Sequence, residues 1–94
     1  MTEHYSRYDT ADYLQTQEEM TLYFEACLEE NDPSLIAHAL GVIARARGMT
    51  QLAKETGLSR ESLYKSLSAE GNPEFSTILK VTKALGIRLH AEMA

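Results

Sequence analysis

The sequence predicts an all-α fold, a compact bundle of about five helices, with a short C-terminal strand if that segment finds a partner. Three observations predict this fold class. Apolar residues recur at three- and four-residue spacings through most of the chain. Residues that begin and end helices divide the chain into short segments, and the connections between them are only a few residues long. With no repeat and no long linker, the 94 residues are expected to form one domain.

The first expected helix begins after Thr16 and ends near Asn31. The run Thr16-Gln-Glu-Glu19 has the Ser/Thr-x-x-Glu form of a capping box, in which two free amides at the helix start are satisfied reciprocally. The apolar residues that follow have the spacing of one helical face, which we expect to be buried. They are Met20, Tyr23, Phe24, Cys27 and Leu28.

A second helix is expected from Pro33 to Gly48. Asp32 can accept a hydrogen bond from the free amides at the helix start, and Pro33 lacks an amide that would have no partner there. Gly48 is expected to stop the helix. The apolar positions of this segment are Leu35, Ile36, Ala39, Leu40 and Ile43.

Two short helices are expected next. The first covers residues 51–56, with Thr50 as its cap and Gly57 as its end. The second covers residues 60–67, with Ser59 as its cap.

A turn at Gly71-Asn-Pro73 is expected to precede a fifth helix that ends at Gly86. Residues 87–94 then alternate apolar and polar side chains, the period of a strand. A lone strand cannot pair its own backbone, so this tail is expected either to pair with a second chain or to fray. The expected inward stripe of the fifth helix is Phe75, Ile78, Leu79, Thr82 and Leu85.

Charge is divided unevenly along the chain, whose formal net charge is −5. Residues 1–34 carry nine acids and one base, a net charge of −8, whereas residues 35–94 carry eight bases and five acids, a net charge of +3. This division suggests two surfaces with different partners, although solvated helix faces would give the same pattern.

Composition argues against membrane, secreted and enzymatic classes. No apolar run approaches the roughly 20 residues of a membrane span, and the first residues lack the pattern of a signal peptide, so a cytoplasmic protein is expected. The single Cys27 lies on an apolar stripe and is expected to be structural. The three histidines have no metal-ligand spacing. We therefore expect no catalytic residue, no metal and no cofactor.

Residues 50–67 have the pattern of a helix-turn-helix. Ala53 is small where two helices would cross, and Gly57 stands where the turn needs a positive φ. In this motif the second helix enters the major groove of DNA while the first crosses the backbone. Four leucines would anchor both helices to the core: Leu52, Leu58, Leu63 and Leu67.

The expected DNA contacts are the polar positions in and beside this motif. Arg60 can bind guanine with two hydrogen bonds, and Glu61 can accept one from cytosine. Thr50 and Gln51, at a helix start, suit a phosphate. The full expected set is Thr50, Gln51, Lys54, Ser59, Arg60, Glu61, Ser62, Tyr64, Lys65 and Asn72.

Three segments carry a resemblance to a known family, with a weaker match at residues 8–14. They are Ala44-Arg-Ala-Arg-Gly-Met-Thr-Gln51, Thr56-Gly-Leu-Ser-Arg-Glu-Ser-Leu-Tyr-Lys65 and Gly71-Asn-Pro73. On these segments the chain resembles the HigA-like probable addiction module antidote proteins, which are antitoxins of type II toxin–antitoxin pairs with a Cro/C1-type (XRE-like) helix-turn-helix. The resemblance implies a homodimeric repressor of its own operon. It also implies that the protein neutralises a small basic toxin of the RelE/ParE superfamily, similar to HigB. Ser59 to Lys65 correspond to the recognition helix, with Gln51 on the backbone side.

The chain is accordingly expected to form a single domain, residues 1–94, with three parts. These are an acidic N-terminal extension and helix (1–31), a helix-turn-helix DNA-binding core (32–86) and a strand-like tail (87–94). Two alternatives stay open. One is a solitary helix-turn-helix transcriptional regulator. The other is a protein-interaction module that has lost DNA binding, which the acidic net charge slightly favours.

Overall fold

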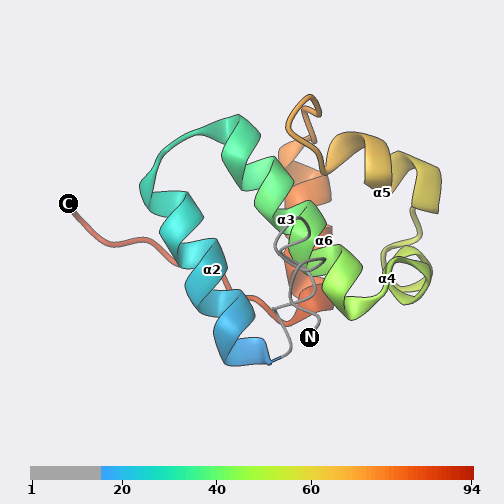
Figure 1. The fold of residues 1–94 in the computed structure, drawn as a ribbon, viewed down its shortest axis with the longest axis horizontal. Coiled ribbons are helices and arrows are strands. Elements are labelled where there is room, and N and C mark those ends of the chain that lie inside the picture. Colours follow the sequence, from blue (N-terminus) through green and yellow to red (C-terminus); the bar gives the residue numbers. More distant parts are fainter. Residues whose placement is uncertain (1–15) are drawn as a thin grey trace, which may run out of the picture.

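Five α-helices and no strand are found in residues 16–94, the part of the chain that the computed structural model describes (Figure 1). The all-α class and the number of helices expected for this part are therefore confirmed. The helices are α2 (Gln17–Glu29), α3 (Pro33–Arg47), α4 (Met49–Thr56), α5 (Arg60–Ser66) and α6 (Phe75–Leu85).

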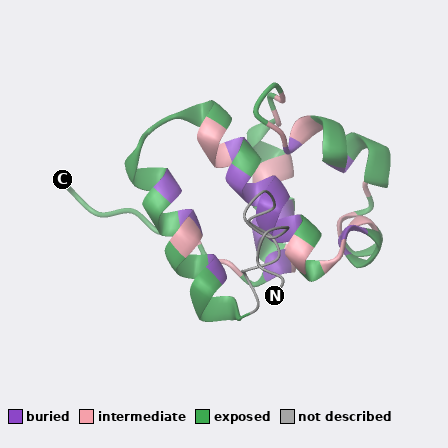
Figure 2. Cartoon of the chain, viewed as in Figure 1, coloured by how far each residue is buried: buried purple, intermediate pink, exposed green. Residues whose placement is uncertain are grey.

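The central element of the fold is α3. It packs against α2, α4, α5 and α6, whereas α2 packs against α3 and no other described helix. Buried residues are concentrated along α3 (Figure 2). Leu40 and Ile43 of this helix have no exposed surface, and they share one apolar core with Leu63 of α5 and Val81 of α6.

Local hydrogen bonds set most of the helix boundaries where the sequence predicts them. Thr16 Oγ1 accepts from the Glu19 amide and Glu19 Oε1 accepts from the Thr16 amide, both at 3.1 Å, which completes the capping box. The Asp32 carboxylate accepts from the amide two residues further on, and the Ser59 hydroxyl from the amide three residues further on, each at 3.0 Å. These bonds satisfy amides that no helical carbonyl can reach.

The expected start of α4 is wrong. This helix begins at Met49 directly after Gly48, so Thr50 lies inside its first turn and does not cap it. Gly48 adopts a φ of 111°, which lets the chain change direction at once, and its carbonyl accepts from the Leu52 amide at 3.1 Å. The reversal between α3 and α4 therefore needs no capping side chain.

The turn before α6 lies earlier than Gly71–Pro73. It spans residues 68–71, where the Gly71 amide donates to the Ser68 carbonyl at 2.9 Å. Residues 72–74 then lead irregularly into the helix. The hydrogen bond that closes the turn thus involves only the first residue of the expected Gly-Asn-Pro motif.

Two expected stripes are partly wrong about which side chains are buried. In α6, Phe75 is 67% exposed and Leu79 is 45% exposed, whereas Val81 is fully buried. Apolar residues occur on more than one side of this short helix, so the spacing does not decide which side meets α3 and α4. In α2, Leu28 is 38% exposed although it follows the buried Phe24 by four residues on the same face, because it lies at the very end of the helix.

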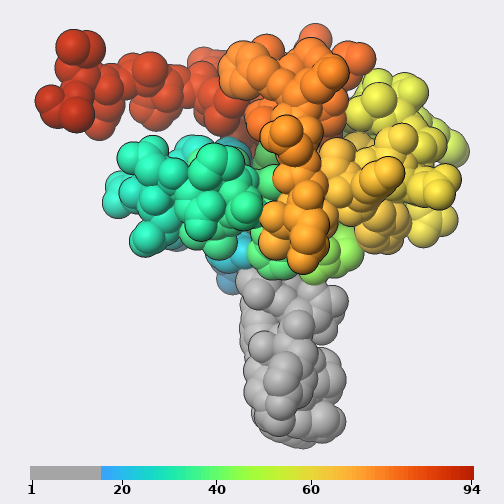
Figure 3. Space-filling view, turned by 90° about the horizontal axis from the view of Figure 1, so that it is seen from above, coloured from blue at the N-terminus to red at the C-terminus, as the bar shows by residue number. Residues whose placement is uncertain are grey.

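The C-terminal tail forms no strand. Its first residues, Ile87 and Leu89, pack against the core, but Met93 is 97% exposed and the chain runs away from the helical body (Figure 3). No strand in residues 16–94 offers a partner, so a β-ladder cannot form within the described chain. Within the described chain the tail therefore follows the second of the two expectations and is irregular, and pairing with a second chain stays a prediction.

A close approach between α3 and the end of α5 depends on a glycine. A Cβ atom at Gly41 would collide with the backbone carbonyl of Leu67. Nearby, Arg47 Nη1 donates to the Leu85 carbonyl at 2.8 Å and so joins the C-terminal ends of α3 and α6. Both contacts link residues far apart in the sequence, and both stabilise the position of α3 among its neighbours.

Tyr23 and Cys27 lie together on the side of α2 that meets α3. Burial is the main cause that raises the pKa of each group. Cys27 is buried and free. Burial opposes the thiolate that nucleophilic chemistry requires.

Residues 1–15 lie outside the described residues. The N-terminal part of the region expected at 1–31 therefore stays a prediction.

Replacing Gly41 with alanine tests the close approach, because the tertiary contact and helix propensity predict opposite changes in the free energy of unfolding. The contact predicts that Gly41→Ala destabilises the protein by about 1–3 kcal/mol, because the new methyl group forces α3 and Leu67 apart. Propensity alone predicts a gain of about 1 kcal/mol. Urea denaturation followed by circular dichroism gives the sign, and a more stable variant would contradict the close approach.

Stability is expected to fall as the pH rises above the ordinary thiol pKa of 9.0. The folded state keeps Cys27 protonated at pH values where the unfolded chain already releases the proton, so alkaline conditions favour unfolding. Denaturation midpoints between about pH 8.5 and about pH 10.5 measure this slope. Cys27→Ala should show a flatter slope, and an identical slope in both proteins would remove Cys27 as the cause.

Candidate nucleic-acid interface

A short turn, residues 57–59, joins α4 to α5 and sets their relative direction. Gly57 lies in the left-handed region with a φ of 76°, a conformation that a Cβ atom would penalise. Thr56 Oγ1 donates to the Leu52 carbonyl at 2.8 Å and accepts from the Leu58 amide at 3.3 Å, which ties the turn to α4. The path of the chain into α5 is thus held by backbone geometry and by one hydroxyl.

One buried residue anchors α5, and the other sides of the helix are open to solvent. Leu63 has no exposed surface, and Leu67, directly after the helix, is 3% exposed. This arrangement places one set of the expected contact residues on a single short helix with its cap. The exposed members are Ser59, Arg60, Glu61, Ser62, Tyr64 and Lys65.

Arg60 is supported by an aromatic ring. Its guanidinium lies 5.9 Å from the centroid of the Tyr64 ring, within the range of a cation–π contact. The four-residue spacing places the two side chains on the same face of α5. That spacing is the sequence signal from which the pairing could have been found. The contact limits the conformations open to Arg60 before any partner arrives.

The expected contacts on α4 are also exposed, but one is partly engaged. Gln51 Nε2 donates to Glu55 Oε2 at 3.0 Å, which uses one of the two N–H groups of the amide. Thr50 and Lys54 are exposed on the same helix. Gln51 therefore keeps its carbonyl oxygen and one N–H group for an external partner.

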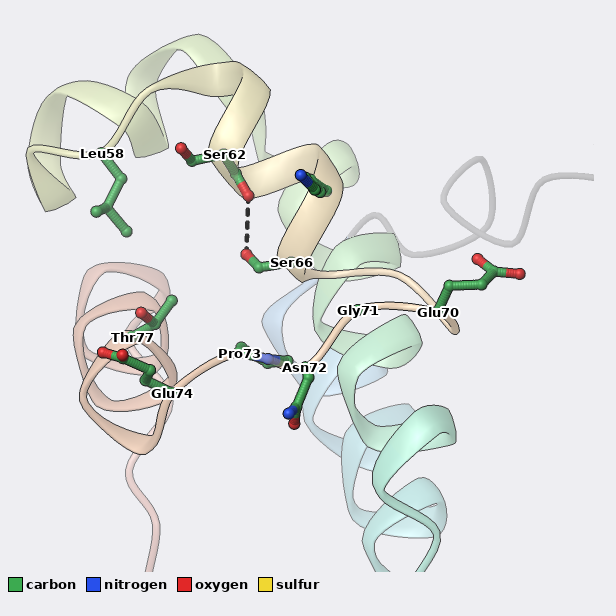
Figure 4. Close-up of a pocket in the computed structure, with 10 residues that line it drawn as sticks. Leu58, Ser62, Ser66, Glu70, Gly71, Asn72, Pro73, Glu74 and Thr77 are labelled. Carbon is green, nitrogen blue, oxygen red and sulfur yellow. Dashed lines mark hydrogen bonds between the residues drawn. The ribbon is translucent and has the colours of Figure 1, made fainter.

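An open groove runs between α5 and the start of α6 (Figure 4). It brings together three of the expected contact residues, Ser62, Lys65 and Asn72. Figure 4 shows the Ser66 hydroxyl bonded to the Ser62 carbonyl along one wall, at 2.9 Å. Asn72 comes from the loop before α6, so tertiary folding supplies this neighbour to α5.

The face formed by α4, α5 and the following loop is nearly neutral. Between residues 49 and 72 three bases stand against three acids. The positive excess of residues 35–94 therefore comes from outside this face. The six charged residues are Lys54, Arg60, Lys65, Glu55, Glu61 and Glu70.

Neither a membrane-spanning helix nor a cluster of metal ligands is found in residues 16–94. No helix in this range is both long and apolar enough to cross a membrane. In the same range, no three histidine, cysteine, aspartate or glutamate side chains form a group that could hold a metal ion.

Comparison with known proteins relates nearly the whole chain to one family. A family model described as "Probable addiction module antidote protein" matches residues 4–93. A protein of Haemophilus influenzae (strain KW20/Rd), described as an uncharacterized protein, is 47% identical over 94 residues, covering 100% of this chain and 97% of its own length. No solved structure matches the chain significantly.

Proposed function

The chain belongs to the family of probable addiction module antidote proteins, and from this premise we propose that it is an antitoxin that also represses its own operon. In this proposal it is a cytoplasmic homodimer of the Cro/C1 helix-turn-helix type. It binds operator DNA, and it neutralises a small basic toxin of the RelE/ParE superfamily, similar to HigB. An antidote family implies a toxin as partner, and the HigA-like resemblance suggests this class of toxin.

The observation that carries the DNA-binding proposal is the exposure of α5. A seven-residue helix with one buried anchor, Leu63, presents a row of hydrogen-bonding side chains at its surface. A helix with this exposure fits the major groove, where base edges can be distinguished by donors and acceptors. Arg60, already positioned by Tyr64, is the side chain we assign to guanine.

A second copy of the chain is required by the small size of this reading surface. One seven-residue helix contacts too few bases and phosphates for high specificity, so two copies are proposed to read half-sites about one DNA turn apart. We assign the contact between copies to Phe75 and Leu79, which lie one turn apart on α6 and are 67% and 45% exposed. A shallow groove continues from Leu79 past Gly86 to Leu89. Pairing of two such faces would bury apolar surface that now meets solvent.

The near-neutral face of α4 and α5 favours a second candidate, an interaction module without DNA binding. Non-specific affinity for DNA comes almost entirely from cations that neutralise phosphates, and here Glu55, Glu61 and Glu70 offset the three bases. Retention on DNA-cellulose at low salt discriminates the two candidates, because an interaction module would flow through.

Replacing Arg60 with alanine is expected to remove sequence preference. Loss of a bidentate guanine contact should weaken binding to the DNA upstream of the gene by about 1–3 kcal/mol, roughly 5- to 150-fold, with little change on random duplex. Lys65→Ala should weaken both complexes to a similar extent, because a phosphate contact carries no sequence information. Gel-shift titrations with both duplexes measure the difference. Equal losses on both duplexes for Arg60→Ala would remove it from the base-reading residues.

Replacing Phe75 and Leu79 together with aspartate is expected to give a folded monomer. Both side chains are exposed, so the helical signal in circular dichroism should be kept while sedimentation velocity shows half the mass. The matched control is Leu22→Asp, at a leucine of α2 that is 66% exposed, which should stay dimeric. A double variant with unchanged mass would place the interface elsewhere.

A further inference from the structure

The outermost helix of the described fold is α2. It contacts α3 through Met20, Phe24 and Cys27, and it packs against no other helix in residues 16–94. At 3.6 residues per turn, a narrow stripe lies directly opposite these buried side chains. The stripe consists of Glu18, Leu22, Glu25 and Glu29, all of them exposed.

An apolar side chain stands in the acidic stripe. Leu22 is 66% exposed, and with Gln17, Thr21 and Gly86 it borders a shallow groove between the first turns of α2 and the end of α6. Single exposed leucines are common on protein surfaces. The position of this one, between Glu18 and Glu25, places an exposed apolar side chain among carboxylates.

The charges at the C-terminal end of α2 oppose the stability of the helix, and this distinguishes it from the other described helices, whereas Glu18 and Glu19 in its first turn are favourably placed. Each of α3, α4, α5 and α6 has a basic residue in its last turn, where the helix dipole is negative. The last turn of α2 has none and carries Glu29 instead, followed by Glu30. Glu25 and Glu29 are also like charges four residues apart, an unfavourable spacing. Neither carboxylate makes a hydrogen bond or ion pair with another described residue.

The other described helices carry a basic residue in the last turn and α2 does not. Such an exception to a local rule points to a functional constraint on α2. We propose that Glu18, Leu22, Glu25 and Glu29 form the docking surface for the toxin, with a basic face of the toxin against the carboxylates and an apolar pocket over Leu22. This inference rests on the proposed function and specifies its partner-binding site. A cationic partner would offset the repulsion that the free helix carries.

The position of this surface determines what happens to DNA binding. α2 and α5 lie on opposite sides of α3 and do not pack against each other (Figure 1). A toxin docked on the outer stripe of α2 would leave Arg60 and its neighbours open. The toxin-bound protein is therefore expected to keep its affinity for operator DNA.

The decisive variant is Glu29→Lys, because docking and stability should change in opposite directions. Lysine at the C-terminal end of α2 complements the dipole and pairs with Glu25, so the free protein should melt about 2–5 °C higher. Affinity for the toxin should fall about 10-fold or more. The probe is the product of the neighbouring gene, titrated into each variant by calorimetry, with thermal melts on the same samples.

The matched control is Glu55→Lys, the same charge change at an exposed glutamate of α4, which should bind the toxin as the wild type does. Leu22→Asp should lose binding while staying folded. If Glu29→Lys and Leu22→Asp both bind the toxin with the affinity of the wild type, the docking surface is overturned and the proposed function still stands. No binding of the neighbouring product by wild type would instead overturn the proposed partner.

A gel shift tests the position of the docking surface relative to α5. A complex in which the toxin adds to the bound DNA supports this position, and release of the DNA would contradict it.

Discussion

The packing of the other four described helices against α3 is the interaction on which the rest of the structure depends. Small residues make this possible, since Ala39 and Ala44 are fully buried and Gly41 lets the end of α5 approach the helix backbone. Large side chains at these positions would keep the neighbours apart. The Arg47 contact with the Leu85 carbonyl adds a polar link between the ends of α3 and α6.

Because α3 supports every neighbour, it also separates the two surfaces to which we assign function. α5 projects from one side of α3 and is steadied by α4, while α2 covers the other side. A partner bound to one of these surfaces need not contact the other surface. This arrangement suits a protein proposed to hold a nucleic acid and a protein partner at once. Most of the acid of this chain of net charge −5 lies in residues 1–34, outside the proposed DNA-binding face.

Some charges at the helix ends stabilise the helices, whereas others do not and are assigned to function. Four described helices place a base where the dipole is negative, and these bases need no partner to explain them. The acids at the end of α2 have no such structural reason. On the side proposed to bind DNA, three acids beside three bases make the attraction to phosphates weak. Specificity is therefore proposed to depend on directed contacts such as that of Arg60, whose guanidinium lies over the Tyr64 ring.

The amino-acid sequence by itself determined the helical class and most helix ends, because caps act within two to four residues. The Thr16 and Glu19 pair, Asp32 before Pro33, and Ser59 form the hydrogen bonds that their spacing predicts. The exposed polar residues of α5 were predicted for a similar reason, since one leucine anchor fixes the outward side of a short helix. Only the tertiary structure decided which side of α6 is buried, and it left Phe75 and Leu79 exposed. It alone decided that α4 starts directly after Gly48, and that the tail, with no partner strand in the described chain, stays irregular. These features depend on contacts between residues far apart in the sequence, and local spacing carries no information about which distant surface a helix will meet.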